Sequence, residues 1–461
     1  MNAPQTLRAW LRNTQIRESD RQEPFLWGPS GSIGLPRLAH GTCLGGRARA
    51  LAGRSVLVAA ADPFAAALAL IELDGVARRL ILCTPDLGST HRRGVIEKAA
   101  VDAVVSDDDQ DEDGVGLRIR VSAHVTDAVD PPGASRDTEW VLLTSGTTSG
   151  PKLVVHTLSS LTAAIRRAPA GAPDVVWGTF YDIRRYGGLQ IFLRAVLGRH
   201  SLVVSGAREA AGRYLARLAE RRVTHVSGTP SHWRRALMSP EARTIEPRYI
   251  RLSGEIADQP ILNALRSFYP KARVAHAFAS TEAGVGFEVD DGLEGFPASL
   301  VSASGDVAID VNDGLLRLRS ARTAIAYLGE DRTGLADADG FVDTGDVVER
   351  RGDRYYFLGR RNGTINVGGL KVYPEEIEAA INRHPAVRMS RVRGRASPIT
   401  GSLVTADVVL HAPPGPDEDA SFKREILQVC REQLAGHKVP ATIRFVPSLD
   451  LAAAGKLARH A

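Results

Sequence analysis

The sequence has 461 residues, of which 44% are hydrophobic and 24% are charged. A chain of this size can bury a large core and should divide into two or three domains. Its formal net charge of +5 comes from arginines that are dispersed along the chain. This pattern argues against nucleic acid as the first partner to consider and favours small anionic ligands.

The cysteine pattern indicates neither a disulfide framework nor a zinc site, because the three cysteines lie far apart and form no CxxC pair. The most apolar region, residues 55–71, is divided by Asp62 and Pro63, which argues against a membrane span. Residues 1–16 lack the apolar core of a signal peptide. We therefore expect a protein of the reducing cytoplasm.

Strand and helix patterns alternate beyond a loop-rich start of about 50 residues, which predicts βαβ units and a mostly parallel sheet. Strands are expected at 55–60, 80–83, 103–106, 175–180, 223–227 and 249–252, and helices at 64–73, 91–100 and 156–167. The acidic run 107–113 lacks the glycine and the terminal glutamate of a calcium loop. It is therefore predicted to be a solvated linker.

A loop rich in hydroxyls and glycines follows the apolar run 140–143, which is typical of a buried strand end. Glycines let backbone N–H groups turn inward, hydroxyls donate further hydrogen bonds, and a lysine adds a positive charge, so the loop suits phosphate. A surface turn is the simpler alternative. The spacing is not that of a Walker A loop. The candidate phosphate ligands are Thr144, Ser145, Gly146, Thr147, Thr148 and Lys152.

The run Thr144 to Lys152, TSGTTSGPK, resembles the phosphate loop of the adenylate-forming superfamily, which includes acyl- and aryl-CoA synthetases, peptide synthetase adenylation domains and luciferases. The resemblance implies an α/β fold. A large N-terminal domain would contain βαβ-layered parallel sheets and a β-rich subdomain, and a small mobile α+β domain would follow. It also implies further motifs in a fixed order.

The acid pocket is the next implied feature. The segment 181–190 resembles a strand-to-helix junction that lines this pocket in the family, and Arg185 stands where a histidine is usual. A guanidinium there could pair with a polar or acidic group of the substrate. A solvated Arg184–Arg185 pair at a helix start is the alternative. The implied pocket residues are Tyr181, Arg185, Tyr186, Gly187, Gly254 and Ala279.

The segment 276–284 resembles the aromatic-Gly-x-Thr-Glu motif of the family, with Ala279 in place of the usual glycine. Carried over, Phe278 would pack against adenine, Thr281 would bond the α-phosphate, and Glu282 would hold Mg²⁺. A capped turn with a core phenylalanine is the alternative. Farther along, Asp346 matches the carboxylate that binds the ribose hydroxyls.

The stretch 357–378 resembles the hinge and the start of the small domain. Arg360 would reach the ribose or phosphate, and Asn362 stands at the hinge position, where Asp or Lys is usual. Gly368 and Gly369 would let a pantetheine arm approach the backbone. We therefore expect an N-terminal ATP- and acid-binding domain at 1–359 and a mobile domain at 360–461.

The small domain is predicted to contain helices at 375–383 and 422–434 and strands at 402–410 and 442–446. Its last loop, 449–459, resembles the family's terminal loop, which carries the catalytic lysine, although the match depends mainly on Gly455, Lys456 and Leu457. By that register Lys456 is the catalytic lysine, and Thr281 and Glu282 complete the catalytic set.

Together these resemblances imply an AMP-forming acid–CoA ligase. ATP, Mg²⁺ and coenzyme A would be its cofactor and co-substrates, and a compact aryl or short acid its substrate. Loading of the phosphopantetheine arm of a carrier protein is the nearest alternative. A nucleotide-binding regulator without catalysis and a serine hydrolase using Ser145 or Ser280 are alternatives of other classes. No GxSxG elbow supports the hydrolase.

Overall fold

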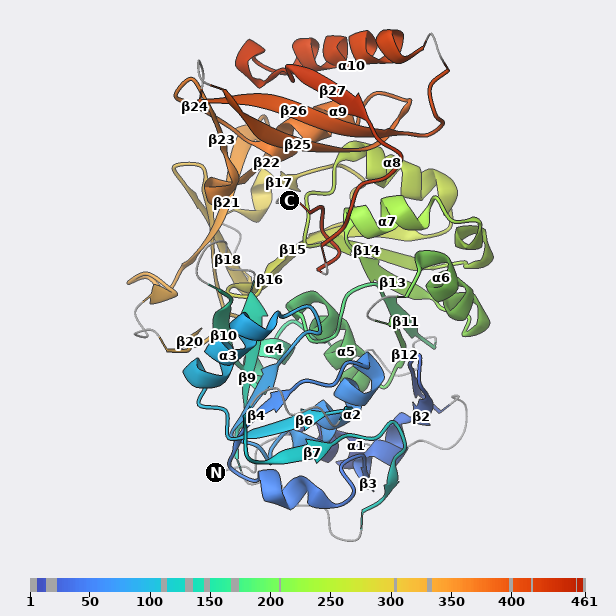
Figure 1. Cartoon of the computed structure of the whole chain (residues 1–461), viewed down its shortest axis with the longest axis vertical. Coiled ribbons are helices and arrows are strands. Elements are labelled where there is room, and N and C mark those ends of the chain that lie inside the picture. The colour runs from blue at the N-terminus through green and yellow to red at the C-terminus, as the bar shows by residue number, and fades with distance from the viewer. Residues whose placement is uncertain are drawn as a thin grey trace.

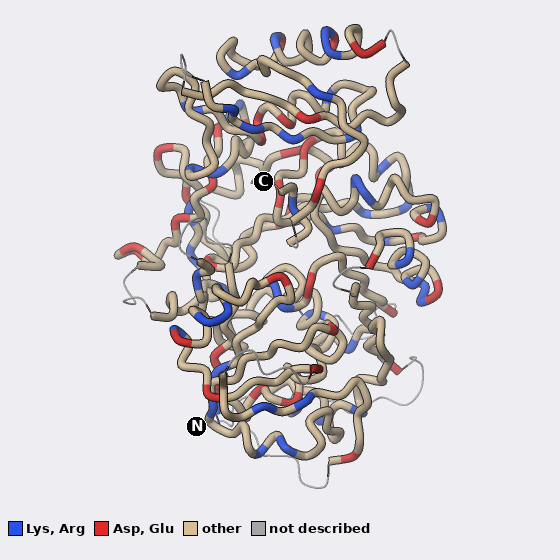
Figure 2. The backbone as a smooth tube through the Cα atoms, in the orientation of Figure 1, with Lys and Arg blue, Asp and Glu red and all other residues tan. Residues whose placement is uncertain are grey.

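The structure is a computed structural model that describes residues 6–13, 23–108, 114–128, 136–144, 150–166, 174–206, 209–301, 305–329, 334–397, 401–415, 418–452 and 454–458. A large body occupies most of the chain, and the C-terminal residues form a smaller body against one end of it (Figure 1). Lys and Arg are spread over both bodies among Asp and Glu (Figure 2). Among the residues drawn in colour they form no continuous basic block.

The first sheet of the large body has eight strands in the order β16-β15-β14-β13-β11-β12-β1-β2. Its six middle strands, β15 to β1, are parallel, and β16 and β2 are antiparallel edges. The strands are, in sheet order, Gly284–Val289, Arg273–Ser280, Tyr249–Ser253, His225–Gly228, Val176–Thr179, Ser201–Val204, Phe25–Trp27 and Ser32–Gly34. This parallel core confirms the α/β prediction.

The second sheet has seven strands in the order β20-β10-β9-β5-β4-β6-β7. They are, in sheet order, Ala326–Tyr327, Lys152–Thr157, Glu139–Thr144, Arg79–Leu82, Ser55–Val58, Ala103–Ser106 and Arg118–Arg120. A small pair, β3 and β8, joins Gly41–Thr42 to Thr126–Asp127.

The helix predicted over 156–167 is wrong at both ends, because His156 and Thr157 belong to strand β10 and residues 163–166 lie beyond the helix. Val154 and Val155, which are β-branched and buried, pair with β9 and extend that strand. Thr157 then forms a capping box with Ser160, so helix α4 begins at Leu158 and ends at Thr162.

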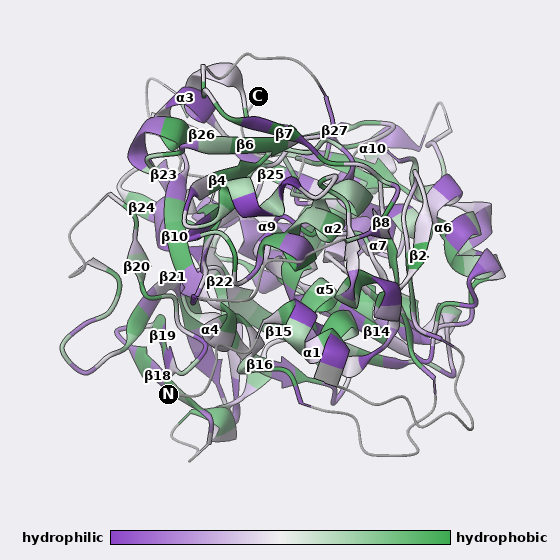
Figure 3. Cartoon of the chain, turned by 90° about the horizontal axis from the view of Figure 1, so that it is seen from below, coloured by the Kyte–Doolittle hydropathy of each residue, from purple (hydrophilic) through white to green (hydrophobic). Residues whose placement is uncertain are grey.

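The helices of the large body cover and separate these sheets. Helices α2 and α5 belong to the core cluster that joins the two sheets, which buries the whole of α2. Hydrophobic residues occur on α5 near the centre of the view in Figure 3, and hydrophilic residues on α6 at its edge. Besides α4, the helices of the large body are α1 Leu7–Asn13, α2 Pro63–Leu73, α3 Ser89–Lys98, α5 Tyr186–Gly198, α6 Ala211–Glu220, α7 Pro230–Ala236 and α8 Gln259–Phe268.

A third, antiparallel sheet forms the β-rich subdomain, in the order β17-β22-β21-β19-β18. Its strands are Phe296–Pro297, Arg354–Arg360, Val342–Arg351, Leu315–Ser320 and Val307–Asn312. β22 ends at Arg360, and a single 3-10 turn, Arg361–Gly363, leads into the small body.

The small body contains a hairpin, β23 Ile365–Val367 and β24 Leu370–Val372, and a sheet of β25, β26 and β27. Helices α9 and α10 share its hydrophobic core with that sheet. The elements are α9 Pro374–Ile381, β25 Val387–Ser397, β26 Gly401–Leu410, α10 Asp419–Gln433 and β27 Thr442–Phe445. Strand β25 was not predicted, because a register shift after Val387 interrupts its apolar alternation.

Among the described residues, no helix has the length and apolarity needed to cross a membrane. Only residues 107–108 of the acidic run 107–113 are described. The first of them has a structural contact that a solvated linker residue would lack. Asp107 accepts hydrogen bonds from the backbone N–H groups of Ala61 and Asp62, both over 2.7 Å, and thereby fixes the turn that follows β4.

Candidate active site

The chain segment that follows β27 returns to the large body and ends in a tight hairpin (Figure 1). Leu451 and Leu457 form an isolated antiparallel bridge, and the N–H of Ala452 donates to the carbonyl of Lys456 over 2.7 Å. Gly455 has φ = +71°, which a glycine adopts without strain. Lys456 therefore projects from the tip of a defined loop.

Lys456 lies against a glycine turn of the large body. A Cβ atom placed on Gly254 would lie 3.5 Å from Cε of Lys456, and Gly254 itself has φ = +85°. Gly455, next to the lysine, packs directly on the ring of His232, where any side chain at position 455 would overlap the imidazole. The sequence-predicted residues Gly254 and Lys456 are thus brought together.

The charge environment of Lys456 is mixed. Its side chain is accessible to solvent, yet the surrounding protein partly desolvates the ammonium group and lowers its pKa. The guanidinium groups of Arg360 and Arg185 lower this pKa further, whereas the carboxylates of Glu255 and Asp346 raise it. These four charged groups all belong to the large body, with Arg360 at the very end of β22.

Asp346 and Arg360 are paired residues of neighbouring strands β21 and β22. Nε of Arg360 lies 3.3 Å from Oδ1 of Asp346, and Nη2 donates to the carbonyl of Thr344 over 3.2 Å. The neighbouring carboxylate is the main cause that raises the pKa of Arg360. The sheet register therefore places both residues at one edge of the site.

Phe278, at a register shift in the β15–β16 pair, is half-buried in an aromatic stack. Its ring lies 5.5 Å from Phe357 and 5.7 Å from Phe287, with nearly parallel planes in both cases. The alternative of a core phenylalanine therefore describes its packing well. Ala279 follows directly on the same strand and is also half-buried.

The Thr281–Glu282 turn is anchored by a buried histidine. Nε2 of His156 lies 2.7 Å from the carbonyl oxygen of Thr281, and Nδ1 lies 2.9 Å from Oγ of Ser160. Burial lowers the pKa of His156 to about 4, so the ring is neutral at pH 7 and donates from Nε2 to the carbonyl. The N–H of Ala324 donates to the carbonyl of Glu282 over 2.9 Å, which fixes the second residue.

Glu282 keeps its carboxylate available for a cation. The hydroxyl of Tyr327 lies 3.4 Å from Oε1 of Glu282. No group of three potential metal ligands occurs in the part of the chain that the structure describes. Mg²⁺ commonly binds through one or two carboxylates together with substrate phosphates, so a single glutamate fits that ion in a nucleotide complex.

The phosphate loop is only framed by the described residues, since Ser145, Gly146, Thr147 and Thr148 lie outside them. Thr144 ends β9 and pairs with Lys152, which begins β10. Nζ of Lys152 lies 4.4 Å from the ring centre of Tyr327. The hairpin that carries the loop thus reaches the same tyrosine as Glu282.

The acid-pocket candidates Tyr181 and Tyr186 are buried. The hydroxyl of Tyr181 donates to the carbonyl of Ser253 over 2.6 Å, and its ring packs against Gly187, where a Cβ atom would lie 3.5 Å away. Burial raises the pKa of both tyrosines, so both hydroxyls stay protonated at neutral pH. Tyr181 therefore lies beside the turn that carries Gly254, whereas Tyr186 belongs to the core cluster that joins the two sheets.

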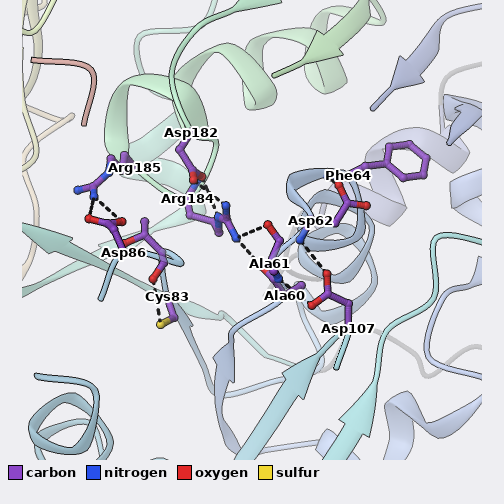
Figure 4. A network of polar contacts seen from close by, with 11 residues as sticks. Ala60, Ala61, Asp62, Phe64, Cys83, Asp86, Asp107, Asp182, Arg184 and Arg185 are labelled. Atoms are coloured by element: carbon purple, nitrogen blue, oxygen red, sulfur yellow. Dashed lines mark hydrogen bonds and ion pairs between the residues drawn. The ribbon is translucent and has the colours of Figure 1, made fainter. Parts of the chain in front are cut away.

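The two neighbouring arginines have different surroundings (Figure 4). Arg184 is 1% exposed, and its side chain donates two hydrogen bonds to Asp182 and reaches the carbonyl of Ala60. The alternative of a solvated pair is therefore wrong for Arg184, which joins the end of β4 to the start of α5. Arg185 instead binds both carboxylate oxygens of Asp86, over 2.7 and 2.9 Å.

Asn362 lies in the exposed 3-10 turn between the bodies. Gly368 and Gly369 form the two-residue turn of the β23–β24 hairpin, with φ of +59° and +87°. A Cβ atom at either glycine would meet no atom within 4 Å among the described residues. In this arrangement the glycine turn is an open surface, and Lys456, not this turn, lies at Gly254.

Three residues at the site were not singled out from the sequence: Thr229, His232 and Glu255. Thr229 caps helix α7 in a capping box with His232, and Pro230 occupies the first helical position. The Thr-Pro-x-His order was a readable signal for a helix start, but not for contact with a loop more than 200 residues away.

Comparison with known proteins assigns the chain to a family. The profile of the AMP-binding enzyme family matches residues 52–304, which is more than half of the chain, and that of the AMP-binding enzyme C-terminal domain matches residues 376–456. The chain belongs to the AMP-binding enzyme family. The adenylate-forming resemblance is therefore confirmed.

Individual relatives are distant. A human mitochondrial acyl-coenzyme A synthetase, ACSM5, is 26% identical over 350 residues, which cover 70% of this chain and 60% of the relative. The 2-succinylbenzoate–CoA ligase of Bacillus velezensis is 26% identical over 343 residues, which cover 70% and 68%. The chain thus spans about 60% of the length of the human relative.

Among solved structures, the anthranilate CoA ligase AuaEII in complex with anthranoyl-AMP has a TM-score of 0.75 at 18% identity, with 99% of this chain and 96% of that chain covered. The o-succinylbenzoate CoA synthetase of Bacillus subtilis in complex with its acyl-adenylate has a TM-score of 0.74 at 20% identity, with 97% and 96% covered. At these identities the likeness shows the fold alone. It extends over both the large and the small body of this chain.

Proposed function

We propose that this protein is an ATP-dependent acid–CoA ligase. It would activate a carboxylic acid as an acyl-adenylate with release of pyrophosphate and then transfer the acyl group to coenzyme A. The observation that carries the proposal is the place of Lys456. This lysine comes from the small body, yet it lies on Gly254 and within the electrostatic reach of Asp346 and Arg360.

In the first step an oxygen of the substrate carboxylate attacks the α-phosphorus of ATP, and the bond to pyrophosphate breaks. Negative charge accumulates on the transferring group, and the ammonium of Lys456 would stabilise it. Asp346 would accept hydrogen bonds from the ribose hydroxyls while Arg360 holds that carboxylate in place. Phe278 would pack against adenine, and the Thr281 hydroxyl would bind the α-phosphate.

The phosphate loop would bind the β- and γ-phosphates. Thr144 and Lys152 frame this loop, and it contains Ser145, Gly146, Thr147 and Thr148. Mg²⁺ held by Glu282 would neutralise phosphate charge. The chain's own part is to fix the backbone that carries this carboxylate, through the contact of His156 with the Thr281 carbonyl and that of Ala324 with the Glu282 carbonyl.

In the second step the thiol of coenzyme A, as thiolate, attacks the acyl carbonyl and AMP leaves. We propose that residues 360–461 rotate about Asn362, relative to residues 1–359, and withdraw Lys456. The open turn at Gly368 and Gly369 would then face the site, where two glycines allow close approach of the pantetheine arm. Asn and Gly at the turn tolerate the change in backbone angles.

The substrate is proposed to be a compact aryl or short acid. Tyr181 and Tyr186 are both buried, and Tyr181 bonds the residue before Gly254; with Gly187, Ala279 and Arg185 they would enclose a small acyl group. The three cysteines of the protein are free and buried, which suits a reducing compartment such as the cytoplasm.

ATP–pyrophosphate exchange, measured across a panel of aryl, short-chain and long-chain acids, tests the proposal. Coenzyme A is then added to each acid that supports exchange. We expect exchange with a compact acid and formation of its CoA thioester. Exchange without thioester would contradict the CoA assignment and point to another acceptor, and no exchange with any acid would contradict adenylation itself.

A further inference from the structure

The backbone on both sides of Lys456 is held by side chains of the large body. The hydroxyl of Thr229 donates to the carbonyl of Gly455 over 2.6 Å. The N–H of Leu457 donates to Oε1 of Glu255 over 2.9 Å. One peptide group before the lysine and one after it are therefore fixed by two different turns, which follow β13 and β14.

Each of these two side chains is also held by contacts within the large body. Thr229 is fully buried and accepts the N–H of His232 over 3.0 Å as the cap of α7. Glu255 accepts the N–H and the hydroxyl of Ser231 over 2.9 and 3.0 Å. Both groups are thus oriented by the start of one helix, so little side-chain freedom is lost when the loop docks.

The fit of the loop is also steric. The imidazole of His232 lies directly under Gly455, and its ring is stacked on Phe180 with centres 5.4 Å apart. Burial is the main cause that lowers the pKa of His232 to about 4, so the ring is neutral at pH 7. Nδ1 accepts from the N–H of Thr229 over 3.1 Å, which holds the ring in that orientation.

We propose that Thr229 and Glu255 are positioning residues that place Lys456 for adenyl transfer and take no part in thioester formation. This inference rests on the proposed function, because it assigns the two contacts to the first of its two steps. A rate that depends on charge stabilisation at a transferring group falls steeply when the charge is displaced by about 1 Å. Two hydrogen bonds on the flanking peptide groups restrict that displacement.

The competing explanation is that these contacts only contribute to general docking or to the stability of α7. In that case, their loss would affect both steps alike, or would show mainly as a loss of folded protein. Assays of the separate half-reactions distinguish the two explanations, because a supplied acyl-adenylate bypasses adenyl transfer.

The test uses two pairs of variants of the full chain. Thr229→Val removes the donor to Gly455 with little change of shape, and Thr229→Ser keeps the hydroxyl as its control. Glu255→Gln removes the carboxylate, and Glu246→Gln removes an equal charge from an exposed site as its control. ATP–pyrophosphate exchange is measured with the acid most active in the panel, and thioester formation with its synthetic adenylate and coenzyme A.

We expect Thr229→Val and Glu255→Gln to lower kcat for exchange roughly tenfold or more, with a smaller change in KM for ATP. Thioester formation from the adenylate should stay within about twofold of the unmodified protein, and both controls should resemble it in both assays. Equal losses in the two half-reactions, or no loss of exchange, would overturn the proposal.

Amide hydrogen exchange of the peptide covering 450–458 gives a reading that does not need catalysis. If the contacts hold the loop, Thr229→Val and Glu255→Gln should speed exchange in this peptide, and Thr229→Ser should not. Unchanged protection would overturn the positioning role even if the proposed ligase activity were established. Faster exchange in a chain that adenylates no acid would support the contacts and contradict only the proposed function.

Discussion

Nδ2 of Asn382 donates to Oδ2 of Asp258 over 2.9 Å and so joins the two bodies of the molecule. Asp258 also binds Nη2 of Arg234 through both oxygens, over 2.5 and 2.6 Å, and Arg234 reaches the carbonyl of Arg388 over 3.0 Å. Asp258 and Asn382 are both buried. The interface on this side therefore contains buried polar contacts that join the two bodies.

Replacing Asn382 by Ala should therefore weaken the observed arrangement of the two bodies. Loss of one hydrogen bond costs about 1 kcal/mol, which favours open arrangements about fivefold. Spin labels at Met238→Cys and Leu370→Cys, both exposed positions, would report the separation, since the native cysteines are buried. Asn382→Ala should enlarge a second distance population. Distributions identical to those of the exposed control Asn312→Ala would contradict this role.

Arg185 should influence the pH dependence of adenylation. The surrounding protein and Arg360 do most to lower the pKa of Lys456, and the positive charge of Arg185 lowers it further. Arg185→Ala should therefore raise this pKa and move the alkaline limb of kcat/KM for exchange to higher pH. The same variant should change acid preference more than ATP affinity. Arg431→Ala, at an exposed site of α10, is the control. If neither the alkaline limb nor the acid preference changed, Arg185 would have only a structural role, in its ion pair with Asp86.

Gly455→Ala should abolish exchange, because the new methyl group would overlap the His232 ring and the residue would keep φ = +71°. The left-handed conformation alone costs an L-residue roughly 1–2 kcal/mol. The double variant Gly455→Ala/His232→Ala removes the overlap but not the backbone strain, so it should recover part of the activity. The steric explanation fails if the double variant is as inactive as the single one and both bind ATP.

Asp74 predicts a pH dependence of stability. It is buried, accepts the N–H of Leu7 over 2.8 Å and lies 3.3 Å from Nε1 of Trp140, and burial raises its pKa to about 6. Because the folded state binds this proton more tightly than the unfolded chain does, the stabilisation is complete below about pH 3.9 and is lost as the pH rises through about 6.

As the pH rises from 4 to 7.5, the free energy of unfolding should therefore fall less for the variant Asp74→Asn than for the unmodified protein. The difference expected from the shift over this pH range is about 2 kcal/mol. Urea titrations at a series of pH values measure it. Parallel pH profiles for the two proteins would show that Asp74 titrates normally in the folded state.

The sequence predicted the parts of the fold that depend on local periodicity. The strands near residues 55, 80 and 103 and helices α2, α3, α9 and α10 lie within a few residues of their expected positions. Short motifs were equally readable, since the Gly455-Lys456 pair and the Asp346 turn do lie at one site. The division at residues 359 and 360 and the roles of the individual site residues stay predictions.

What could not be predicted depends on contacts between distant segments. Arg184 and Arg185 look alike in the sequence, yet one is buried against the end of β4 and the other pairs with Asp86. Thr229 and Glu255 contact a loop that lies more than 200 residues away, and no spacing rule relates them. Strand β25 was missed because its register shift interrupts the apolar alternation.

The most direct test of the central claim is Lys456→Ala, assayed for ATP–pyrophosphate exchange with the best acid of the panel and for ATP binding by calorimetry. Because Lys456 is proposed to act on charge that develops during transfer, exchange should fall by about a hundredfold or more while the Kd for ATP changes by less than about threefold. Exchange at the unmodified rate would contradict the assignment of Lys456, and with it the account of the site.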